Sequence, residues 1–342
     1  MSPILYALAA AGLFGVATPL AKLLTPAMSA WMLAGLLYLG SGVGLAIVRA
    51  VAGRRGAAVS RADVPWLLGA IASGGIIGPL LLMWGLQATS GSSASLLLNA
   101  EGVFTALIAW FVFRENFDRR IALGMLLIVA GAVILAAPGG AGGWSVGSLG
   151  VLGACLAWAI DNNLTRKVSL ADATTIAMLK GLVAGAVNVA VGLALGSAHP
   201  PALQVGATAL LGFVSYGVSL VLFVKALREL GTARTSAYFS AAPFVGAAAS
   251  FLVLRETPTW SFLVALALMA AGVWLHITER HSHRHTHPAM DHEHEHIHDE
   301  HHEHSHDPAV PPGERHSHPH HHDGTTHSHA HYPDAHHRHR HS

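Results

Sequence analysis

The sequence predicts an all-α integral membrane protein of ten transmembrane helices, arranged as two inverted five-helix repeats and followed by a disordered C-terminal tail. Three observations lead to this fold class. Apolar segments of about 20 residues recur up to about residue 280, two stretches of the chain align with each other, and arginine and lysine gather in alternate loops. An α-helix rises about 1.5 Å per residue, so each segment can cross about 30 Å of hydrocarbon.

The apolar segments come first. We expect membrane-spanning helices at about residues 3–24, 28–50, 64–87, 91–113, 119–138, 146–165, 174–196, 204–229, 231–254 and 260–278. Charged residues make up only 11% of the chain, and a soluble fold with so many apolar runs would expose patches that monomers do not tolerate. The first segment lacks a charged stretch before it and a cleavage site after it, so we expect a retained helix.

The internal repeat divides the chain. Residues 82–135 align without a gap with residues 223–276, mainly by hydropathy and a few shared landmarks. These landmarks are Leu86 with Leu227, Ser95 with Ser236, Ala100 with Ala241, Arg114-Glu115 with Arg255-Glu256, and Gly131 with Gly272. Internally duplicated membrane bundles are most often secondary transporters. We therefore assign residues 1–138 to a first repeat, 139–278 to a second and 279–342 to the tail.

The loop charges predict the orientation. With the N-terminus in the cytoplasm, the outer loops receive little beyond Lys22 and Arg255, and the inner loops receive the other basic residues, as the positive-inside rule requires. These are Arg49, Arg54, Arg55, Arg61, Arg114, Arg119, Arg120, Arg166, Lys167, Arg228 and Arg234. Five spans per half is an odd number, so the second half is inserted upside down and the C-terminus is also cytoplasmic. A site is then expected near the midplane, between the halves.

One motif links the chain to a known family. The first span reads LFGVATPLAK (13–22), an aromatic-Gly…Lys pattern with a weaker echo at 157–166. With the ten short spans, the paired repeat and the Arg-Glu after spans four and nine, the chain resembles EamA-like members of the drug/metabolite transporter superfamily over residues 1–278. The resemblance implies a central cavity lined by spans one to four and six to nine, with spans five and ten peripheral. It leaves the solute open among amino acids, nucleobases, sugars, amines and drugs. We expect the protein to lie in a bacterial-type inner membrane.

Glu101 is the sharpest candidate for a site residue. It lies about ten residues into span four, and an ionisable side chain at that depth costs about 2.5–3.5 kcal/mol on insertion scales. Asn99 is close in sequence, although residues i and i+2 do not share a helix face. We interpret Glu101 as a substrate or proton site, and the alternative is a carboxyl group satisfied by a neighbouring helix.

Further polar residues interrupt spans six to eight. Asp161 and Asn162 lie in span six, where they either bind a ligand or cap a frayed helix end. Lys180 in span seven and Lys225 in span eight either extend to the headgroups or pair with Asp161 or Glu101. An ion pair of this kind is one that substrate or protons could break.

Prolines and tryptophans complete the candidates inside the spans. Pro19, Pro79 and Pro243 remove backbone hydrogen bonds, which predicts kinks or hinges beside a cavity. Trp84 and Trp158 lie deeper than the other tryptophans, where they either line the cavity or simply pack.

The tail changes character completely. All but two of the chain's 26 histidines, His199 and His276, follow residue 280, interleaved with Asp, Glu, Ser and Pro. No core can form from this composition. Imidazoles bind Zn, Ni, Co and Cu, and the candidate metal ligands are His281, His283, His285, His287, His292, His294, His296, His298, His301, His302, His304, His306, His316, His318, His320, His321 and His322. The rival interpretation is charge regulation, because histidines titrate near pH 6.5.

Three functional classes remain. The leading one is a secondary transporter of a small metabolite or drug, expected to export it and to need no cofactor. The alternatives are a divalent transition-metal transporter and a membrane-anchored metal buffer or sensor. The spans carry neither a Walker motif nor His-Glu-x-x-His or Gly-x-Ser-x-Gly, so we expect no enzyme, and no nucleic acid as a partner. The partners are the bilayer, the solute and divalent metal ions, and a homo-oligomer is compatible with the sequence. The single cysteine, Cys155, excludes an intramolecular disulfide.

Overall fold

The computed structural model divides into a helical unit, Met1–Glu279, and a tail unit, Arg280–Ser342, each of which is treated on its own. It describes residues 2–52, 59–112, 119–137, 144–165, 168, 172–230, 235, 238–278, 282–287, 290–296, 316–322 and 325–330. Arg114 and Glu115, one half of the repeated Arg-Glu pair, lie outside these residues.

The first part of the helical unit contains helices that follow the expected apolar segments. They are α1 (Pro3–Gly15), α2 (Ala17–Leu24), α3 (Ala30–Ala52), α4 (Val64–Ala70), the π-helical turn η1 (Ile71–Ile77), α5 (Gly78–Ala88), α6 (Gly91–Leu97), α7 (Ala100–Phe111) and α8 (Arg119–Ala136). The segments expected at 3–24, 64–87 and 91–113 are thus interrupted helices. Their interruptions fall at Val16, at η1 and at Leu98–Asn99.

The second part of the helical unit follows the same pattern. Its elements are α9 (Val146–Thr165), α10 (Ala173–Ala194), α11 (Ala202–Gly212), the π-helical turn η3 (Phe213–Val218), α12 (Ser219–Leu230), α14 (Ala242–Val253) and α15 (Trp260–Ile277). Like η1, η3 interrupts an otherwise continuous helix, and the chain turns at 240–241 before α14. π-Helical turns often lie at functional sites.

Eight helices among the described residues are long and apolar enough to cross a membrane. Two other expected spans correspond to α9 and to α14, the latter a shorter apolar helix. The outward surface is apolar: Leu126 on α8 is 64% exposed and Leu252 on α14 is 82% exposed. A surface of this kind is unstable in water and suits a lipid environment.

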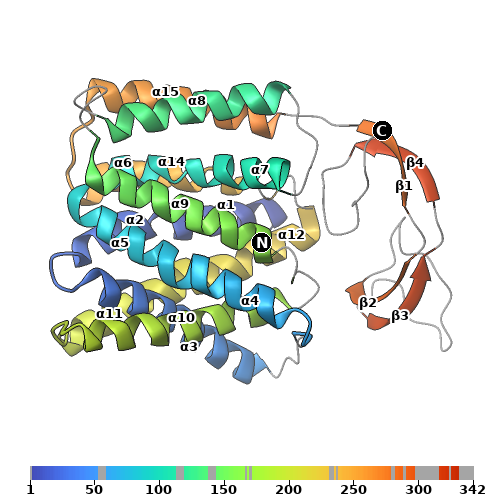
Figure 1. Cartoon of the computed structure of the whole chain (residues 1–342), viewed down its shortest axis with the longest axis horizontal. Coiled ribbons are helices and arrows are strands. Elements are labelled where there is room, and N and C mark those ends of the chain that lie inside the picture. The colour runs from blue at the N-terminus through green and yellow to red at the C-terminus, as the bar shows by residue number, and fades with distance from the viewer. Residues whose placement is uncertain are drawn as a thin grey trace. The chain divides into compact units, whose positions relative to one another are not determined.

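The helices pack in pairs that join the two parts of the helical unit. α3 packs along α10, α6 on α14, α5 on α9, and α1 on α12. Small residues permit the closest approach, because a Cβ added to Gly181 of α10 would lie 2.7 Å from the Cα of Gly42 on α3. α8 and α15 lie side by side at one edge, where the family resemblance places spans five and ten (Figure 1).

The described residues of the tail unit form four strands. β1 (Ser282–His287) pairs antiparallel with β4 (Thr325–Ala330), and β2 (Met290–His296) pairs antiparallel with β3 (His316–His322). The composition predicts a disordered tail, whereas the structure contains these strands. Alternating sequences with a period of two are compatible with extended strands, which the composition argument did not consider.

Candidate functional site

An ion pair with little exposure to solvent joins α9 and α10 in the helical unit. Lys180 on α10 donates to both carboxylate oxygens of Asp161 on α9, at Nζ–Oδ1 2.6 Å and Nζ–Oδ2 2.5 Å. The Asp161 side chain is 8% exposed and that of Lys180 is 16% exposed. The Thr165 hydroxyl, one turn further along α9, adds a third hydrogen bond to Oδ1 at 2.8 Å. Lys180 and Lys225 are the two candidate partners for a carboxylate, and the structure shows Lys180 bonded to Asp161.

The π-helical turn η1 lies against this ion pair. An added Cβ at Gly74 would overlap the Asp161 carboxylate, so this position has room only for glycine. The carbonyl oxygen of Gly74 accepts hydrogen bonds from the Tyr38 hydroxyl at 2.8 Å and from Trp158 Nε1 at 2.9 Å. Asn188 Nδ2 donates to the next carbonyl, that of Gly75, at 3.3 Å. Side chains from three other helices therefore satisfy the carbonyls of the turn.

Glu101 lies where span four is interrupted. The chain leaves α6 at Leu97 and enters α7 at Ala100, so Glu101 is in the first turn of α7, where the helix dipole favours a negative charge. Its Oε1 accepts a hydrogen bond from Asn162 Nδ2 at 2.8 Å, and the same amide lies 3.4 Å from the Thr105 hydroxyl. Glu101 is half-buried and Asn162 is exposed. Glu101 and Asn162 belong to different sequence halves, so this contact joins them.

The two carboxylates share one neighbourhood. Glu101 interacts electrostatically with both Asp161 and Lys180. The Tyr38 ring lies beside that of Tyr216 in η3, with centroids 5.7 Å apart, and Tyr216 also meets Phe14 of α1 at 5.7 Å. Acidic, basic, amide and aromatic side chains from both halves thus gather around the two π-helical turns.

The remaining candidates contact other residues. Asn99 is buried and its Nδ2 donates to the Leu96 carbonyl at 2.9 Å, so it closes the end of α6. Lys225 is exposed, with its Nζ 5.7 Å from the centre of the Tyr6 ring. Trp84 packs on Gly150 of α9, eleven residues or about 16 Å along the helix from Asp161.

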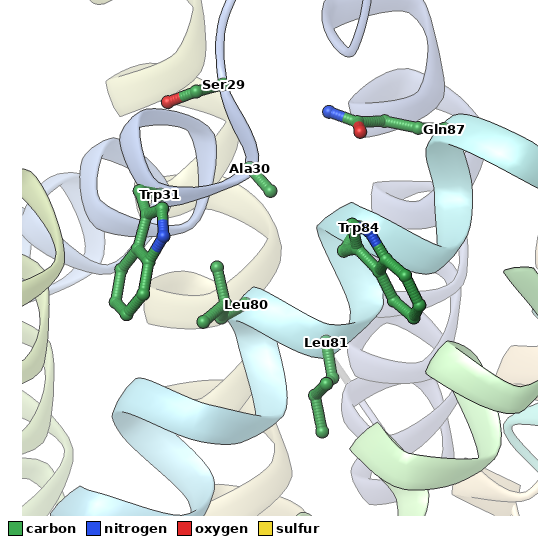
Figure 2. Close-up of a pocket in the computed structure, with 7 residues that line it drawn as sticks. All are labelled: Ser29, Ala30, Trp31, Leu80, Leu81, Trp84 and Gln87. Carbon is green, nitrogen blue, oxygen red and sulfur yellow. The ribbon is translucent and has the colours of Figure 1, made fainter. Parts of the chain in front are cut away.

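Trp84 lines a separate groove. Figure 2 shows the residues of this groove on the start of α3 and on α5. The volume of the groove is about 500 Å³. Its lining residues are Ser29, Ala30, Trp31, Leu80, Leu81, Trp84 and Gln87. Trp158, the other deep tryptophan, is 7% exposed and belongs to the cluster around η1.

The three prolines lie just after helix interruptions. Pro19 is the third residue of α2, Pro79 the second of α5 and Pro243 the second of α14. Proline is tolerated in a first turn because its missing N–H would have no partner there. Their role as hinges stays a prediction.

The tail histidines named above lie outside the residues whose side chains the structure describes. Within the described part of the chain, no group of three or more His, Cys, Asp or Glu side chains could hold a metal ion.

Some residues of the cluster were missed by the sequence argument. Tyr38, Thr105 and Asn188 are polar side chains inside apolar spans, and that signal was available. Thr105 also follows Glu101 by four residues, on the same helix face. Only the tertiary contacts distinguish these three from other polar side chains in the spans.

Comparison with known proteins agrees with this architecture. A profile of the EamA-like transporter family matches residues 1–137 and 145–278. A solved crystal structure matches with a TM-score of 0.61 at 18% identity, covering 81% of this chain and 99% of that chain, which shows a shared fold.

Several relatives are named as transport proteins. An uncharacterised transporter of Methanothermobacter thermautotrophicus is 28% identical, covering 77% of this chain and 82% of its own length. A probable terminal-alkyne amino-acid exporter of Streptantibioticus cattleyicolor is 26% identical over 62% of this chain and 73% of its own. The probable 4-amino-4-deoxy-L-arabinose-phosphoundecaprenol flippase subunit ArnE of Pseudomonas fluorescens is 35% identical over 30% of this chain and 88% of its own. This chain belongs to the EamA-like transporter family, whose members are multi-pass membrane transporters of small molecules rather than enzymes.

Proposed function

We propose that the chain is a secondary transporter that exports a small metabolite or drug by alternating access between two inverted five-helix repeats. The observation that carries the proposal is the polar cluster, because Glu101 of the first half bonds Asn162 of the second. A site between two repeats becomes accessible from either side when one repeat rocks against the other. Export is the direction named for the Streptantibioticus relative.

Three features support the duplication. The family profile matches two stretches that divide the helical unit, and ArnE aligns over nearly its whole length with less than a third of this chain. The turns η1 and η3 interrupt the third helical segment of each half, and breaks at Leu98–Asn99 and 240–241 interrupt the fourth. The contact of α1 with α12 corresponds to that of α9 with α5, as expected if the halves exchange by a two-fold axis. We propose ten spans in an inner membrane, with both termini on its cytoplasmic side, because this topology fits the inverted arrangement.

The charges of the cluster suggest the class of solute. Lys180 neutralises Asp161, whereas the hydrogen bond that the Glu101 carboxylate accepts comes from the neutral amide of Asn162. A carboxylate in this setting favours a ligand that brings a positive charge. The compounds in the names of the Streptantibioticus and Pseudomonas relatives, an amino acid and an amino sugar, both carry an amino group. We therefore propose a solute that carries an ammonium group, which Glu101 would receive.

An efflux assay tests this function. Proteoliposomes are loaded with labelled phenylalanine or with labelled phenylpropionate, which lacks the amino group, and efflux is followed at several pH values. We expect faster efflux of the amine, and Glu101→Gln should remove both that preference and the pH dependence. Lys225→Gln, an exposed site away from the cluster, is the matched control. Equal efflux of both compounds through the unaltered protein would contradict the proposed solute class.

For the tail we propose divalent metal binding on the cytoplasmic side. Histidines occupy alternate positions of β2 and β3, and the register pairs His292 with His320 and His294 with His318. Imidazole-rich segments bind Zn, Ni, Co and Cu. The test compares metal bound per chain, by mass spectrometry after dialysis, for the full chain and for a chain that ends after Arg280. Equal metal content would exclude the tail as the binding segment.

The metal alternatives can be separated in cells. If the bundle itself carried metal, both the chain shortened after Arg280 and Glu101→Gln would abolish a change in the cellular content of one metal. If only the shortened chain alters metal content, the tail is a buffer and the bundle moves an organic solute. The described residues of the helical unit give no support to metal as the transported solute.

A further inference from the structure

Four segments meet at the end of the helical unit where α2, α5 and α14 end and α6 begins. Glu256, three residues after α14, accepts two backbone hydrogen bonds from the start of α6. These are Gly91 N to Oε1 at 2.7 Å and Ser92 N to Oε2 at 2.9 Å. A carboxylate on the free N–H groups of a first helical turn is a charge-assisted cap. Unlike an ordinary cap, this carboxylate comes from a segment far away in the sequence and from the other half of the chain.

Lys22 completes the arrangement. It lies in the last turn of α2, and its ammonium donates to the carbonyl oxygen of Leu86 on α5. It also interacts electrostatically with Glu256. The cation thus connects the ends of α2 and α5 and attracts the carboxylate that caps α6. Lys22 belongs to the family-like motif and Glu256 to the repeated Arg-Glu pair, and the sequence alone assigns a role to neither.

The local backbone is shaped to make this contact. Arg255 has a φ of 53°, in the left-handed region that non-glycine residues rarely adopt, and it turns the chain directly before Glu256. Side chains at the end of α14 crowd Gly91, because an added Cβ would lie 2.5 Å from Leu254 Cδ1 and 2.9 Å from Ser250 Oγ. The end of α14 and the start of α6 therefore approach closely just where the carboxylate bonds the backbone.

We propose that Glu256 and Lys22 form a latch that closes this end of the helical unit, and that the latch breaks when the transporter changes state. The inference rests on the alternating access proposed above, and with a cytoplasmic N-terminus this is the outer end. Glu256 supplies the tie between the halves, because Lys22, Leu86 and the start of α6 all belong to the first half. Opening toward the outside then requires α14 to release α6.

The opposite end offers a matched control. There Arg49 of α3 bonds the Thr175 hydroxyl and lies 3.7 Å from the Asp172 carboxylate. Asp172 is also an acidic cap, since its Oδ2 accepts from Thr175 N at 3.1 Å, but it caps its own helix. Asp172→Asn therefore removes the same kind of charge at a helix start, but it loosens a contact between the halves at the opposite end instead of at the latch.

Thiol labelling tests the latch without a known substrate. Ser95 of α6 is 1% exposed and sits against Gly246 of α14, below the latch, so Ser95→Cys reports separation of these helices. Cys155→Ala removes the native thiol. Intact cells are treated with a membrane-impermeant maleimide, and the rate of modification is measured. We expect Glu256→Gln and Lys22→Gln each to raise this rate at least 5-fold, and Asp172→Asn not to raise it, because it loosens the opposite end. The Glu256→Gln and Lys22→Gln double variant should show less than the product of the two single effects, because the residues act together.

Hydrogen exchange gives a second readout that needs no engineered cysteine. In purified full-length protein, Glu256→Gln should accelerate exchange of the Gly91 and Ser92 amides at least 5-fold, while the start of α10 is unchanged. If Glu256→Gln leaves both the labelling rate and the exchange at its parental value, the latch is refuted and Glu256 is a static cap. If the latch variants respond as expected but no solute is exported, the proposed function fails and the latch stands.

Discussion

Asp161 and Glu101 are two carboxylates at membrane depth, and they are held in opposite ways. Asp161 is buried, and Lys180 donates to both of its oxygens. Glu101 is half-buried, and its hydrogen-bond donor is the amide of the exposed Asn162. One carboxylate is hydrogen-bonded to a cation, and the other, among the described residues, is hydrogen-bonded to a neutral amide from the opposite half of the chain.

This difference indicates that Asp161 stabilises the fold, whereas the Glu101 carboxylate is free to bind a proton or a solute in the proposed function. Removing charges from water costs several kcal/mol per ion, and a close counter-ion with further hydrogen bonds compensates for it. Asp161 has this compensation from Lys180 and Thr165. Among the described residues the Glu101 carboxylate is hydrogen-bonded to an amide and not to a cation. A proton or a cationic solute would therefore lower the free-energy cost of burying its charge. That is why Glu101, rather than Asp161, is assigned the solute in the proposed function.

The largest effect is expected from breaking the ion pair. Lys180→Ala leaves the Asp161 carboxylate buried without its cation, which should cost about 3–5 kcal/mol of folding free energy. The exposed Lys225→Ala is the control, with a loss of at most about 1 kcal/mol from its contact with the Tyr6 ring. Denaturation of the purified proteins by SDS titration measures both. Equal losses would show that the Asp161–Lys180 pair contributes nothing special.

A smaller loss should follow from crowding Asp161 without changing any charge. A methyl group at Gly74 overlaps the Asp161 carboxylate, so Gly74→Ala should cost about 1–3 kcal/mol. Gly102→Ala is the matched control, because nothing lies within 4 Å of an added Cβ there and alanine favours the helix. The comparison is made by the midpoint of thermal unfolding. A Gly74→Ala protein as stable as Gly102→Ala would argue against this packing.

Removing one donor from the carbonyl of Gly74 should cost less again. Tyr38→Phe deletes a hydroxyl while the Trp158 bond remains, so we expect a loss of about 0.5–1.5 kcal/mol. Trp158→Phe combined with Tyr38→Phe leaves the carbonyl without either donor. The double variant should therefore lose more stability than the two single variants together. Simple additivity in the same unfolding assay would mean that water replaces the missing donors.

The smallest effect on stability is expected at Glu101. Glutamine keeps an oxygen that accepts from Asn162, so Glu101→Gln should change the folding free energy by no more than about 0.5 kcal/mol. Asp161→Asn should cost more, because it leaves the Lys180 ammonium without its counter-ion. Thermal unfolding of the two variants side by side measures this difference. A reversed order would remove the distinction between the two carboxylates.

Part of this architecture is predictable from the sequence because it depends on local properties. Long apolar runs in a chain with few charges are sufficient for membrane helices, and the expected segments 64–87 and 146–165 correspond closely to Val64–Ala88 and Val146–Thr165. The polar residues at depth, Glu101, Asp161 and Lys180, are conspicuous in the same way, since each costs free energy in a lipid environment. The number of spans and the inverted repeat stay predictions.

The arrangement of the site could not be predicted to the same degree. Nothing local in the sequence selects Lys180 over Lys225 as the partner of Asp161, or Asn162 as the partner of Glu101. The π-helical turns and the break at Leu98–Asn99 were also missed, because each interruption is tolerated only where other helices satisfy the carbonyls it frees. Tyr38, Trp158 and Asn188 do so at η1.

The sequence by itself determined that this chain forms apolar membrane helices and ends in a histidine-rich tail. Hydropathy, segment length and composition act on each segment separately, so no knowledge of neighbours is needed. Only the tertiary structure decided which charge is neutralised, which carboxylate remains available and which acid ties α14 to α6. Those outcomes depend on distances of a few ångströms between side chains on different helices, and the one-dimensional order of residues does not contain them.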